Sequence, residues 1–528
     1  PVIFLGHTLT LFGDATNNGG GIFNSDSGTV TVQNSTLSGN FAFNGGGIHN
    51  RLSGTVTVQN STLSGNSAFY GGGIYNRLSG TVTVQNSTLS GNFAFNGGGI
   101  WMADGATIVN LDSTIVAGNT AGVGPDVHRA GGTLNVRHSL IQTTVSGGIN
   151  GTNSNNLPVG TDPLLGPLQN NGGPTFTHAL LPGSPAIDAG FNYAGSSFDQ
   201  RGPGFPRTVN GTTDIGAFES QSLFAVGAGP GGGPHVRVYN ADGSLRFSFF
   251  AFAPAFTGGV RVAVGDVNGD GTQDIIVGAG PGGGPHVRVF SGVDLTELAS
   301  FFAFAPGFTG GVFVAAGNLN GDNFMEVIVG AGAGGGPHVR SFQISGGVAT
   351  VLPGPLGNFF AYAPSFTGGV HVAAGNFDGI GNDEIITGAG AGGGPHVKAF
   401  RADGAVIASF FAYAPSFTGG VFVASADLDD NGLAEIITGA GAGGGPHVKV
   451  FNGGNANPVG DFFAYNAAFT GGVRVGTVRL EGGDIGILTG PGPGGAPNVR
   501  IFDGMTLNAL DSFFAFDPLF TGGVFVGG

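Results

Sequence analysis

Side chains that carry oxygen alternate along one short stretch of the sequence. They are Asp266, Asn268, Asp270, Thr272 and Asp274. Calcium takes six to eight oxygen ligands, and alternate residues of a tight loop can all point toward one centre. Gly271 stands at the sixth position of the stretch, where such a loop needs a sharp turn. The stretch therefore predicts a calcium-binding loop, here named the first loop.

Three later stretches keep this spacing with fewer matching residues. The second loop offers Asn318, Asn320, Asp322 and Glu326, and the fourth offers Asp427, Asp429, Asn431 and Glu435. The third loop keeps Asn376, Asp378 and Glu384, but Ile380 stands where the central ligand belongs. A fifth stretch, residues 478–486, has lost the pattern. The alternative at each loop is an Asx turn without metal, and the sequence leaves the third and fifth loops open between the two.

The loops lie inside a longer repeat that starts near Ser222. A Pro-His-Val phrase recurs at intervals of mostly 51 or 52 residues and once of 58, with histidines at His235, His286, His338, His396 and His447 and with Asn498 in the sixth copy. The first complete unit contains four strand candidates, Val260–Gly265, Asp274–Gly278, His286–Phe290 and Ser300–Phe304. Four short strands per unit of about 40–50 residues are typical of a propeller blade.

The apolar run after the first loop, Ile275–Gly280, completes a pattern that resembles the FG-GAP repeats of integrin α-subunit propellers and their bacterial relatives. The resemblance implies that the loop residues bind calcium. The segment Leu223–Gly229 matches the second strand of a unit, and Val524–Gly528 matches a first strand. Pairing the two would complete a sixth blade and remove open sheet edges. Residues 222–528 are thus predicted to form a six-bladed propeller, and truncation within a longer array is the alternative.

The repeated histidines lie on the opposite face of this propeller from the loops. A ring of histidines and phenylalanines could bind a ligand or a metal there. The alternative is that each histidine satisfies a turn and each phenylalanine packs between blades. We favour the second interpretation, because blade packing alone produces such symmetric repetition.

The first part of the chain carries a shorter repeat. Gly-Gly-Gly-Ile recurs every 26 residues, and a Thr-Val-Thr-Val-Gln-Asn-Ser-Thr-Leu phrase begins at Thr29, Thr55 and Thr81. Such a short unit suits one coil of a parallel β-helix, in which stacked coils share a core. We expect residues 1–160 to form a short right-handed parallel β-helix. Two ladders are predicted inside it, a valine ladder of Val30, Val56 and Val82 and an asparagine ladder of Asn34, Asn60 and Asn86.

This repeat resembles that of the polymorphic outer-membrane proteins. The matching phrases are Gly45–Ile48 and Leu37–Asn40, and the second departs from the family at its aromatic residue. The resemblance implies an exported β-helix, often adhesive.

Residues 161–221 are irregular and rich in proline. They resemble the module that ends many bacterial exported β-helix proteins, and we expect them to cover the open end of the stack as a capping and linking segment. Asp188, Asp199 and Arg201 could form a catalytic cluster, but a buried structural network is the interpretation we favour.

Composition narrows the function. A net charge of −15 argues against nucleic-acid binding, because phosphate recognition needs a basic face. The chain has no cysteine and no apolar run long enough to cross a membrane as a helix. No signal peptide precedes Pro1, so an exported location is inferred from the domains.

We expect a non-enzymatic extracellular or bacterial cell-surface protein that acts in adhesion or as a structural surface component. Its expected partner is a surface glycan, an extracellular protein or a copy of itself. The alternative is a β-helix that binds or degrades polysaccharide, since enzymes of that class also use this fold. The coils offer few acids or bases for such chemistry, Asp26 and Arg51 being among them.

Overall fold

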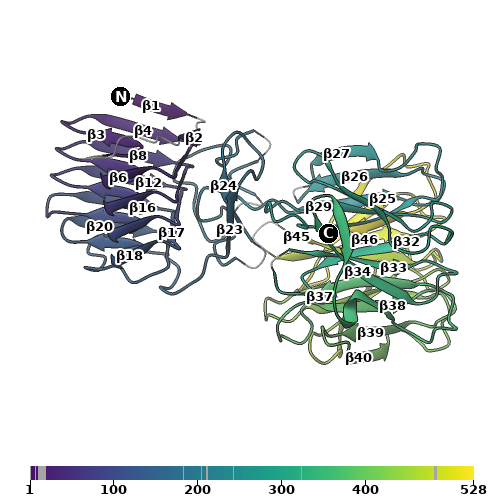
Figure 1. Cartoon of the computed structure of the whole chain (residues 1–528). Coiled ribbons are helices and arrows are strands. Elements are labelled where there is room, and N and C mark those ends of the chain that lie inside the picture. Colours follow the sequence, from purple (N-terminus) through teal and green to yellow (C-terminus); the bar gives the residue numbers. More distant parts are fainter. Residues whose placement is uncertain are drawn as a thin grey trace. The chain divides into compact units, whose positions relative to one another are not determined.

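The computed structural model is all-β and divides the chain into two compact units, Pro1–Gln221 and Ser222–Gly528 (Figure 1). It describes residues 2–5, 8–9, 19–181, 184–203, 205–209, 212–241, 243–322, 324–480 and 484–528. Within these residues no helix is long and apolar enough to cross a membrane.

The first unit contains a parallel β-helix whose stacked coils build four sheets. The first sheet is β1 (Val2–Leu5), β4 (Thr29–Gln33), β8 (Thr55–Gln59), β12 (Thr81–Gln85), β16 (Ile108–Asp112), β20 (Thr133–Arg137) and β22 (Asn153–Ser154). The second sheet is β2 (Thr8–Leu9), β5 (Thr36–Ser38), β9 (Thr62–Ser64), β13 (Thr88–Ser90), β17 (Ile115–Ala117) and β21 (Leu140–Ile141). The third sheet is β6 (Phe41–Asn44), β10 (Ser67–Tyr70), β14 (Phe93–Asn96) and β18 (Thr120–Val123). The fourth sheet is β3 (Ile22–Asn24), β7 (Ile48–Asn50), β11 (Ile74–Asn76), β15 (Ile100–Met102) and β19 (Val127–Arg129).

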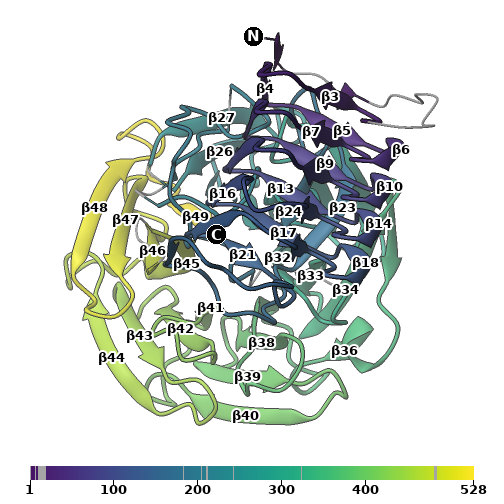
Figure 2. The same cartoon turned by 90° about the vertical axis from the view of Figure 1, so that its left-hand side faces the viewer.

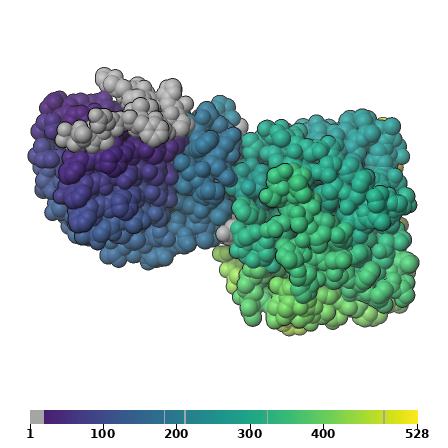
Figure 3. All heavy atoms as spheres, in the orientation of Figure 1, coloured from purple at the N-terminus to yellow at the C-terminus, as the bar shows by residue number. Residues whose placement is uncertain are grey.

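The core of the β-helix is built from identical residues stacked in register. Val30 pairs with Val56, and Val56 pairs with Val82, and all three side chains are buried. Alternation of threonine and valine places one face of each strand inside, because successive side chains of a strand point to opposite faces. The predicted valine ladder is confirmed. Figure 3 shows the β-helix as purple to blue spheres that lie against one another over the visible face that grey atoms do not cover.

The predicted asparagine ladder is wrong in its residues. Asn34, Asn60 and Asn86 have positive φ angles of 50°, 43° and 45°, which asparagine tolerates better than most residues. The amides of Asn60 and Asn86 donate to the carbonyl oxygens of Phe198 and Phe191, in the segment that flanks the coils. Two other positions form the ladders, Asn24–Asn50–Asn76 and Asn40–Asn66–Asn92–Asn119, whose side-chain amides bond from coil to coil at 2.8–3.0 Å.

We expected residues 161–221 to cover the open end of the stack, but they lie along its side. The outward position of the second sheet carries Thr36, Thr62 and Thr88 and then, in the next coils, Ile115 and Leu140. All five side chains are buried.

The flanking segment supplies the partners of this row. Gln200 bonds to the hydroxyls of Thr36 and Thr62, and Ile215 and Phe218 pack with Ile115 and Leu140. The threonines of the row thus hold the segment by hydrogen bonds, and the isoleucine and leucine hold it by apolar packing. Among its described residues the segment has one two-stranded sheet, β23 (Leu165–Gln169) with β24 (Thr177–Leu180).

The second unit is a propeller of six antiparallel blades. Figure 2 shows the outermost strands of three of them, β40 (Val406–Phe411), β44 (Pro458–Phe463) and β48 (Ala509–Phe514), at the rim. The closing blade is β49 (Val524–Gly527), β25 (Leu223–Ala228), β26 (His235–Asn240) and β27 (Leu245–Phe250). Blade 1 is β28 (Val260–Gly265), β29 (Asp274–Ala279), β30 (His286–Phe290) and β31 (Glu297–Phe302). Blade 2 is β32 (Val312–Gly317), β33 (Glu326–Ala331), β34 (His338–Ser345), β35 (Val348–Val351), η1 (Pro355–Gly357) and β36 (Asn358–Phe360).

The remaining blades repeat the four-strand pattern. Blade 3 is β37 (Val370–Gly375), β38 (Glu384–Ala389), β39 (His396–Phe400) and β40 (Val406–Phe411). Blade 4 is β41 (Val421–Ala426), β42 (Glu435–Ala440), β43 (His447–Phe451) and β44 (Pro458–Phe463). Blade 5 is β45 (Val473–Arg479), β46 (Ile485–Pro491), β47 (Asn498–Asp503) and β48 (Ala509–Phe514).

Closure of the ring follows the predicted scheme. β49 pairs antiparallel with β25, with Val524 opposite Ala228 and Val526 opposite Val226. The predicted fourth strand Ser300–Phe304 is displaced, because Glu297–Phe302 forms the strand and the Ala303 amide bonds back to the Pro285 carbonyl oxygen at 2.9 Å. The single interval of 58 residues contains the additional hairpin of blade 2, in which β35 pairs with β34.

Candidate metal centre

The first loop connects β28 to β29 and is held by its own acidic side chains. The Asp266 carboxylate accepts hydrogen bonds from the amides of Gly269, Asp270 and Gly271 at 2.7–3.2 Å. The Asp274 carboxylate, at the start of β29, accepts from the Val267 amide at 3.0 Å. Gly269 and Gly271 both have φ near 74°, the left-handed region that glycine enters at least cost. The turn thus places Asp266, Asp270 and Asp274 in one buried cluster.

Electrostatics in the first loop favour a cation. Burial and the nearby Asp270 charge raise the pKa of Asp266 to about 6. Burial, Asp270 and Asp266 together raise the pKa of Asp274 well above its ordinary value. A divalent cation would remove this repulsion, and the donors are oxygen atoms of carboxylate, amide and hydroxyl groups, which suit calcium. Asp266, Asn268, Asp270, Thr272 and Asp274 fit a calcium ion in their chemistry.

The fourth loop, between β41 and β42, brings its acids closest together. Oxygen atoms of Asp427, Asp429 and Glu435 lie within 4.8 Å of one another, and this is the only such acidic or histidine-containing group of three among the described residues. Burial and the charges of Asp429 and Asp427 raise the pKa of Glu435. Asn431, the remaining predicted ligand, accepts a hydrogen bond from the Leu433 amide at 2.8 Å. The sequence pattern was more complete in the first loop, but the tightest acidic group lies in the fourth.

The second loop is largely satisfied by internal hydrogen bonds. The Asn320 amide donates to Asp322 and to Glu326, each at 2.8 Å, and Asn318 accepts from the Gly321 amide at 2.8 Å. Burial raises the pKa of Glu326 to about 7. The Asn320 amide thus holds the two carboxylates, Asp322 and Glu326, together. The second loop has two carboxylates and the first loop has three, so the second loop offers less negative charge to a metal.

The third loop contains a cation of its own. The Nε atom of Arg401, which follows β39, lies 2.8 Å from the Asp378 carboxylate. Asn376 accepts from the Gly379 amide, Glu384 accepts from the Phe377 amide, and the Ile380 side chain faces solvent. Arg401 therefore neutralises the carboxylate that a metal would use, and this favours the Asx turn without metal. In the fifth loop, residues 481–483 lie outside the described residues.

The repeated histidines of the propeller pack between aromatic rings. His235 lies between the rings of Phe250 and Phe516, with centroids 4.8 and 5.0 Å away, and its Nε2 lies 2.8 Å from the Ser248 hydroxyl. The same sandwich recurs at His286, and its Nε2 lies 2.9 Å from the hydroxyl of Ser300. These histidines thus contact an aromatic residue of their own blade and one from the segment that follows the neighbouring blade, which supports the packing interpretation.

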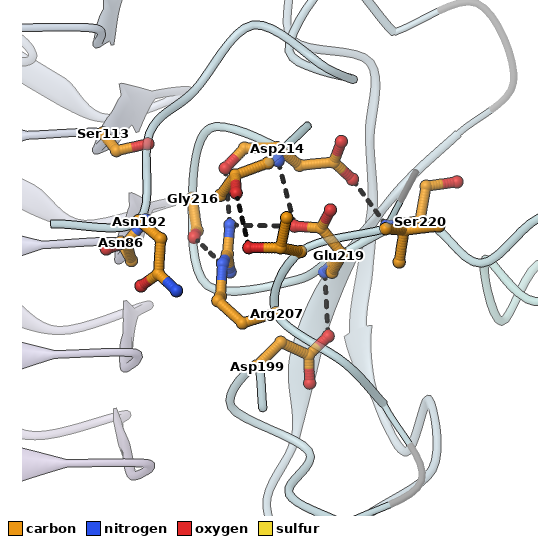
Figure 4. A network of polar contacts seen from close by, with 12 residues as sticks. Asn86, Ser113, Asn192, Asp199, Arg207, Asp214, Gly216, Glu219 and Ser220 are labelled. Atoms are coloured by element: carbon orange, nitrogen blue, oxygen red, sulfur yellow. Dashed lines mark hydrogen bonds and ion pairs between the residues drawn. The ribbon is translucent and has the colours of Figure 1, made fainter. Parts of the chain in front are cut away.

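The acidic and basic residues of the flanking segment form a buried network (Figure 4). Arg201 pairs with Asp199 at 2.8 Å, and Arg207 pairs with Glu219 at 3.2 Å, all four side chains being fully buried. Burial raises the pKa of Asp214 to about 7. Asp188 joins through its backbone amide, which donates to Asp214 at 2.8 Å. The Arg201–Asp199 pair has no solvent access, and the partly exposed Asp188 meets the network through its backbone amide, which supports the structural interpretation of all three residues.

Two features were missed by sequence reasoning. One is a row of exposed phenylalanines on the third sheet of the β-helix, whose signal was the aromatic residue at a fixed place in each coil. The other is a ring of side chains in the propeller channel. Its signal was the residue after each Phe-Thr-Gly-Gly-Val phrase, which varies where its neighbours repeat.

Comparison with known proteins supports the β-helix of the first unit and one repeat of the second unit. A family model described as a right-handed β-helix region matches residues 14–161, and an FG-GAP repeat model matches residues 258–292. No curated protein matches the chain.

Several solved structures are similar in part. A Bacteroides caccae protein of unknown function is 13% identical over 58% of this chain and 98% of its own, with a TM-score of 0.37. A Bacillus licheniformis rhamnogalacturonan lyase is 14% identical over 58% of this chain and 68% of its own, with a TM-score of 0.28. The V. cholerae biofilm matrix protein Bap1 is 18% identical over 50% of this chain and 41% of its own, with a TM-score of 0.27.

Proposed function

We propose that this protein is a non-enzymatic, calcium-binding component of the cell exterior that holds copies of itself together through one face of its β-helix. The observation that carries the proposal is a row of exposed phenylalanines on the third sheet. Phe43, Phe69 and Phe95 are 40–58% exposed, and Phe41 and Phe93 form a second row beside them. Exposed apolar patches of this kind mark interaction sites on soluble proteins.

The geometry of the rings favours a protein surface over a sugar. The Phe43 and Phe69 rings are stacked with centroids 5.1 Å apart and planes 4° apart, and Phe69 and Phe95 are stacked at 5.1 Å and 8°. Each ring therefore covers the face of the next, and the sheet presents ring edges to solvent. A pyranose packs on the face of an aromatic ring, and these faces are already covered.

Charge favours a second copy as the partner. The open groove between the two rows has a volume of about 660 Å³ and is lined by phenylalanine, alanine, serine, threonine and glycine, without a charged residue. The whole chain carries a net charge of −15, so two copies repel each other over most of their surface. An uncharged apolar face is where they can meet at the lowest electrostatic cost.

Calcium has a stabilising part in this proposal. The FG-GAP match includes the first loop, and the fourth loop holds three acidic groups in reach of one ion. The likeness of the coils to exported, adhesive β-helix proteins supports a location outside the cell.

The test is sedimentation velocity over a concentration series in calcium. Wild-type protein should associate as concentration rises, and the variant F43S/F69S/F95S should stay monomeric. The expected loss is about 100-fold or more in the association constant, since burying an apolar side chain contributes about 1.5–3 kcal/mol and each 1.4 kcal/mol is tenfold. The matched control is M505S/L510S/L519S, which removes three exposed apolar residues from the propeller.

Two outcomes would overturn the proposal. A wild-type protein that stays monomeric at every concentration would refute self-association. Glycan binding that is lost in F43S/F69S/F95S, with no self-association in wild type, would replace it with the polysaccharide-binding alternative.

A further inference from the structure

A ring of six side chains closes one end of the propeller channel. Each comes from the second residue of an innermost strand, and in blade order from blade 1 they are Arg261, Phe313, His371, Phe422, Arg474 and Phe525. Cationic or imidazole groups therefore alternate with phenylalanines. The three phenylalanine rings come from alternate blades, yet their centroids lie 6.3–6.4 Å apart, so they meet across the channel axis.

The two arginines of this ring flank one phenylalanine. The Cζ atom of Arg261 lies 5.0 Å from the centroid of Phe525, and that of Arg474 lies 4.6 Å from the same centroid. Arg261 is 8% exposed and Arg474 is 6% exposed. Two guanidinium groups are thus buried on either side of a single ring.

Neither guanidinium has its hydrogen-bonding capacity met. The Nε and Nη1 atoms of Arg261 are buried without a partner, as is the Nε atom of Arg474. Arg474 makes one bond, from Nη1 to the Pro491 carbonyl oxygen at 2.6 Å. A buried polar group without a partner costs free energy, and an unpaired buried charge costs more.

The rest of the chain shows what a buried arginine normally receives here. Among the described residues four arginines are buried. Arg201 lies between two phenylalanine rings, with its Cζ 3.9 and 3.8 Å from their centroids, but it also pairs with Asp199. Arg207 pairs with Glu219. Only the two channel arginines, of these four, have aromatic neighbours and no carboxylate.

The third polar member of the ring brings no negative charge. The Nδ1 of His371 lies 2.6 Å from the Val421 carbonyl oxygen, and its ring stacks on Phe422 with centroids 4.1 Å apart. Burial lowers the pKa of His371 to about 4, of Arg261 to about 10 and of Arg474 to about 9. At neutral pH the imidazole is neutral and both guanidiniums are charged, so the channel has two uncompensated positive charges.

We propose that the propeller channel binds a small inorganic anion beside this ring of six side chains, close enough to the guanidinium groups of Arg261 and Arg474 to offset their charges. A cavity of about 80 Å³ lies in the channel next to the ring, lined by the residues that follow these six in the innermost strands. Guanidinium groups bind chloride and the oxyanions sulfate and phosphate through charge-assisted hydrogen bonds. Such an ion supplies the charge that Asp199 supplies to Arg201.

The test is thermal unfolding of the full chain at saturating calcium and constant ionic strength. Sodium gluconate, whose anion is too bulky for the cavity, is replaced stepwise by chloride or by sulfate at low millimolar concentration, because phosphate would precipitate with calcium. We expect the melting temperature of the wild-type propeller to rise by a few degrees with at least one of these ions. The variant R261M, which loses no hydrogen bond, should melt higher than wild type in gluconate and should show no rise with the ion.

Line broadening of the chloride-35 NMR signal gives a direct reading, expected in wild type and absent in R261M and R474M. The matched control is R340M, which removes an arginine at the outer strands, where Arg340 donates to the Ala303 carbonyl oxygen. This control should keep the anion-dependent rise even if its melting temperature falls. Equal melting of wild type in all three salts, with equal chloride line widths in wild type and R261M, would overturn the proposal.

Discussion

The β-helix and the propeller use repetition in opposite ways. In the β-helix identical residues stack in register, and the stack itself makes the surface, as with the phenylalanine row Phe43, Phe69 and Phe95. In the propeller the repeat makes the frame, and the chemistry lies where blades differ. Arg401 neutralises the third loop, whereas the first loop has three carboxylates close together.

The two units also differ in whether their first and last strands are paired with each other. A β-helix coil contacts the coils above and below, so an end coil has one neighbour. The propeller has no end, because β49 and β25 join the two termini of the unit in one sheet. The propeller should thus respond to a terminal deletion as a whole, and the β-helix should respond locally.

The largest expected effect comes from deleting residues 524–528. Val524, Phe525 and Val526 are buried, and each buried apolar side chain contributes about 1.5–3 kcal/mol. The deletion also exposes the paired edge of β25. We expect the propeller to lose on the order of 5 kcal/mol of unfolding free energy, measured as a lower urea midpoint by near-ultraviolet circular dichroism.

The single tryptophan gives the control for this deletion. Trp101 lies in β15 of the β-helix, so its fluorescence follows that unit. Its urea midpoint should be the same in the full and shortened chains. A deletion that leaves the dichroism midpoint unchanged would mean that β49 does not hold the ring closed.

Fold and site were predictable from the sequence to different degrees. Period-26 and period-51 repeats determine which strands stack or pair, so the coils, the blades and the closure by Val524–Gly528 could be inferred. The place of residues 161–221 could not, because their contacts with Thr36 and Thr62 join positions more than 130 residues apart. Arg401 was missed for a similar reason, since it reaches the third loop from the turn that follows β39.

Calcium should produce the next largest effect, and only in the propeller. A ligand that binds the native state alone stabilises it by about 2.7 kcal/mol at one hundred times its Kd. Calorimetry in millimolar calcium and in EDTA should therefore show a higher melting temperature for the propeller with calcium, while Trp101 fluorescence melts at one temperature in both. Identical calorimetric traces would refute calcium binding.

The pH dependence of this calcium effect follows from the acidic loops. The pKa of Asp266 is raised to about 6 in the folded state, against about 3.9 in an unfolded chain. Between these values the folded state binds more protons, so without calcium the propeller loses stability as pH rises from about 4 to 6. Calcium pairs with the carboxylates and should abolish this loss. The pKa of Asp214 in the first unit is also raised, to about 7. Its contribution to the pH dependence of stability should be the same with and without calcium.

The smallest expected effect comes from substitutions that make the third loop resemble the first. The variant I380D restores an acid at the central ligand position, and I380D/R401Q also removes the arginine that pairs with Asp378. Equilibrium dialysis should show one more bound calcium in the double variant than in wild type, because a carboxylate freed from Arg401 can serve an ion. I380D alone should bind the additional ion more weakly, since Arg401 then competes with it. At calcium five times the new Kd the gain is about 1 kcal/mol, and it is partly offset by loss of the exposed ion pair between Arg401 and Asp378. An unchanged stoichiometry in the double variant would show that more than Arg401 and Ile380 separates the third loop from the first.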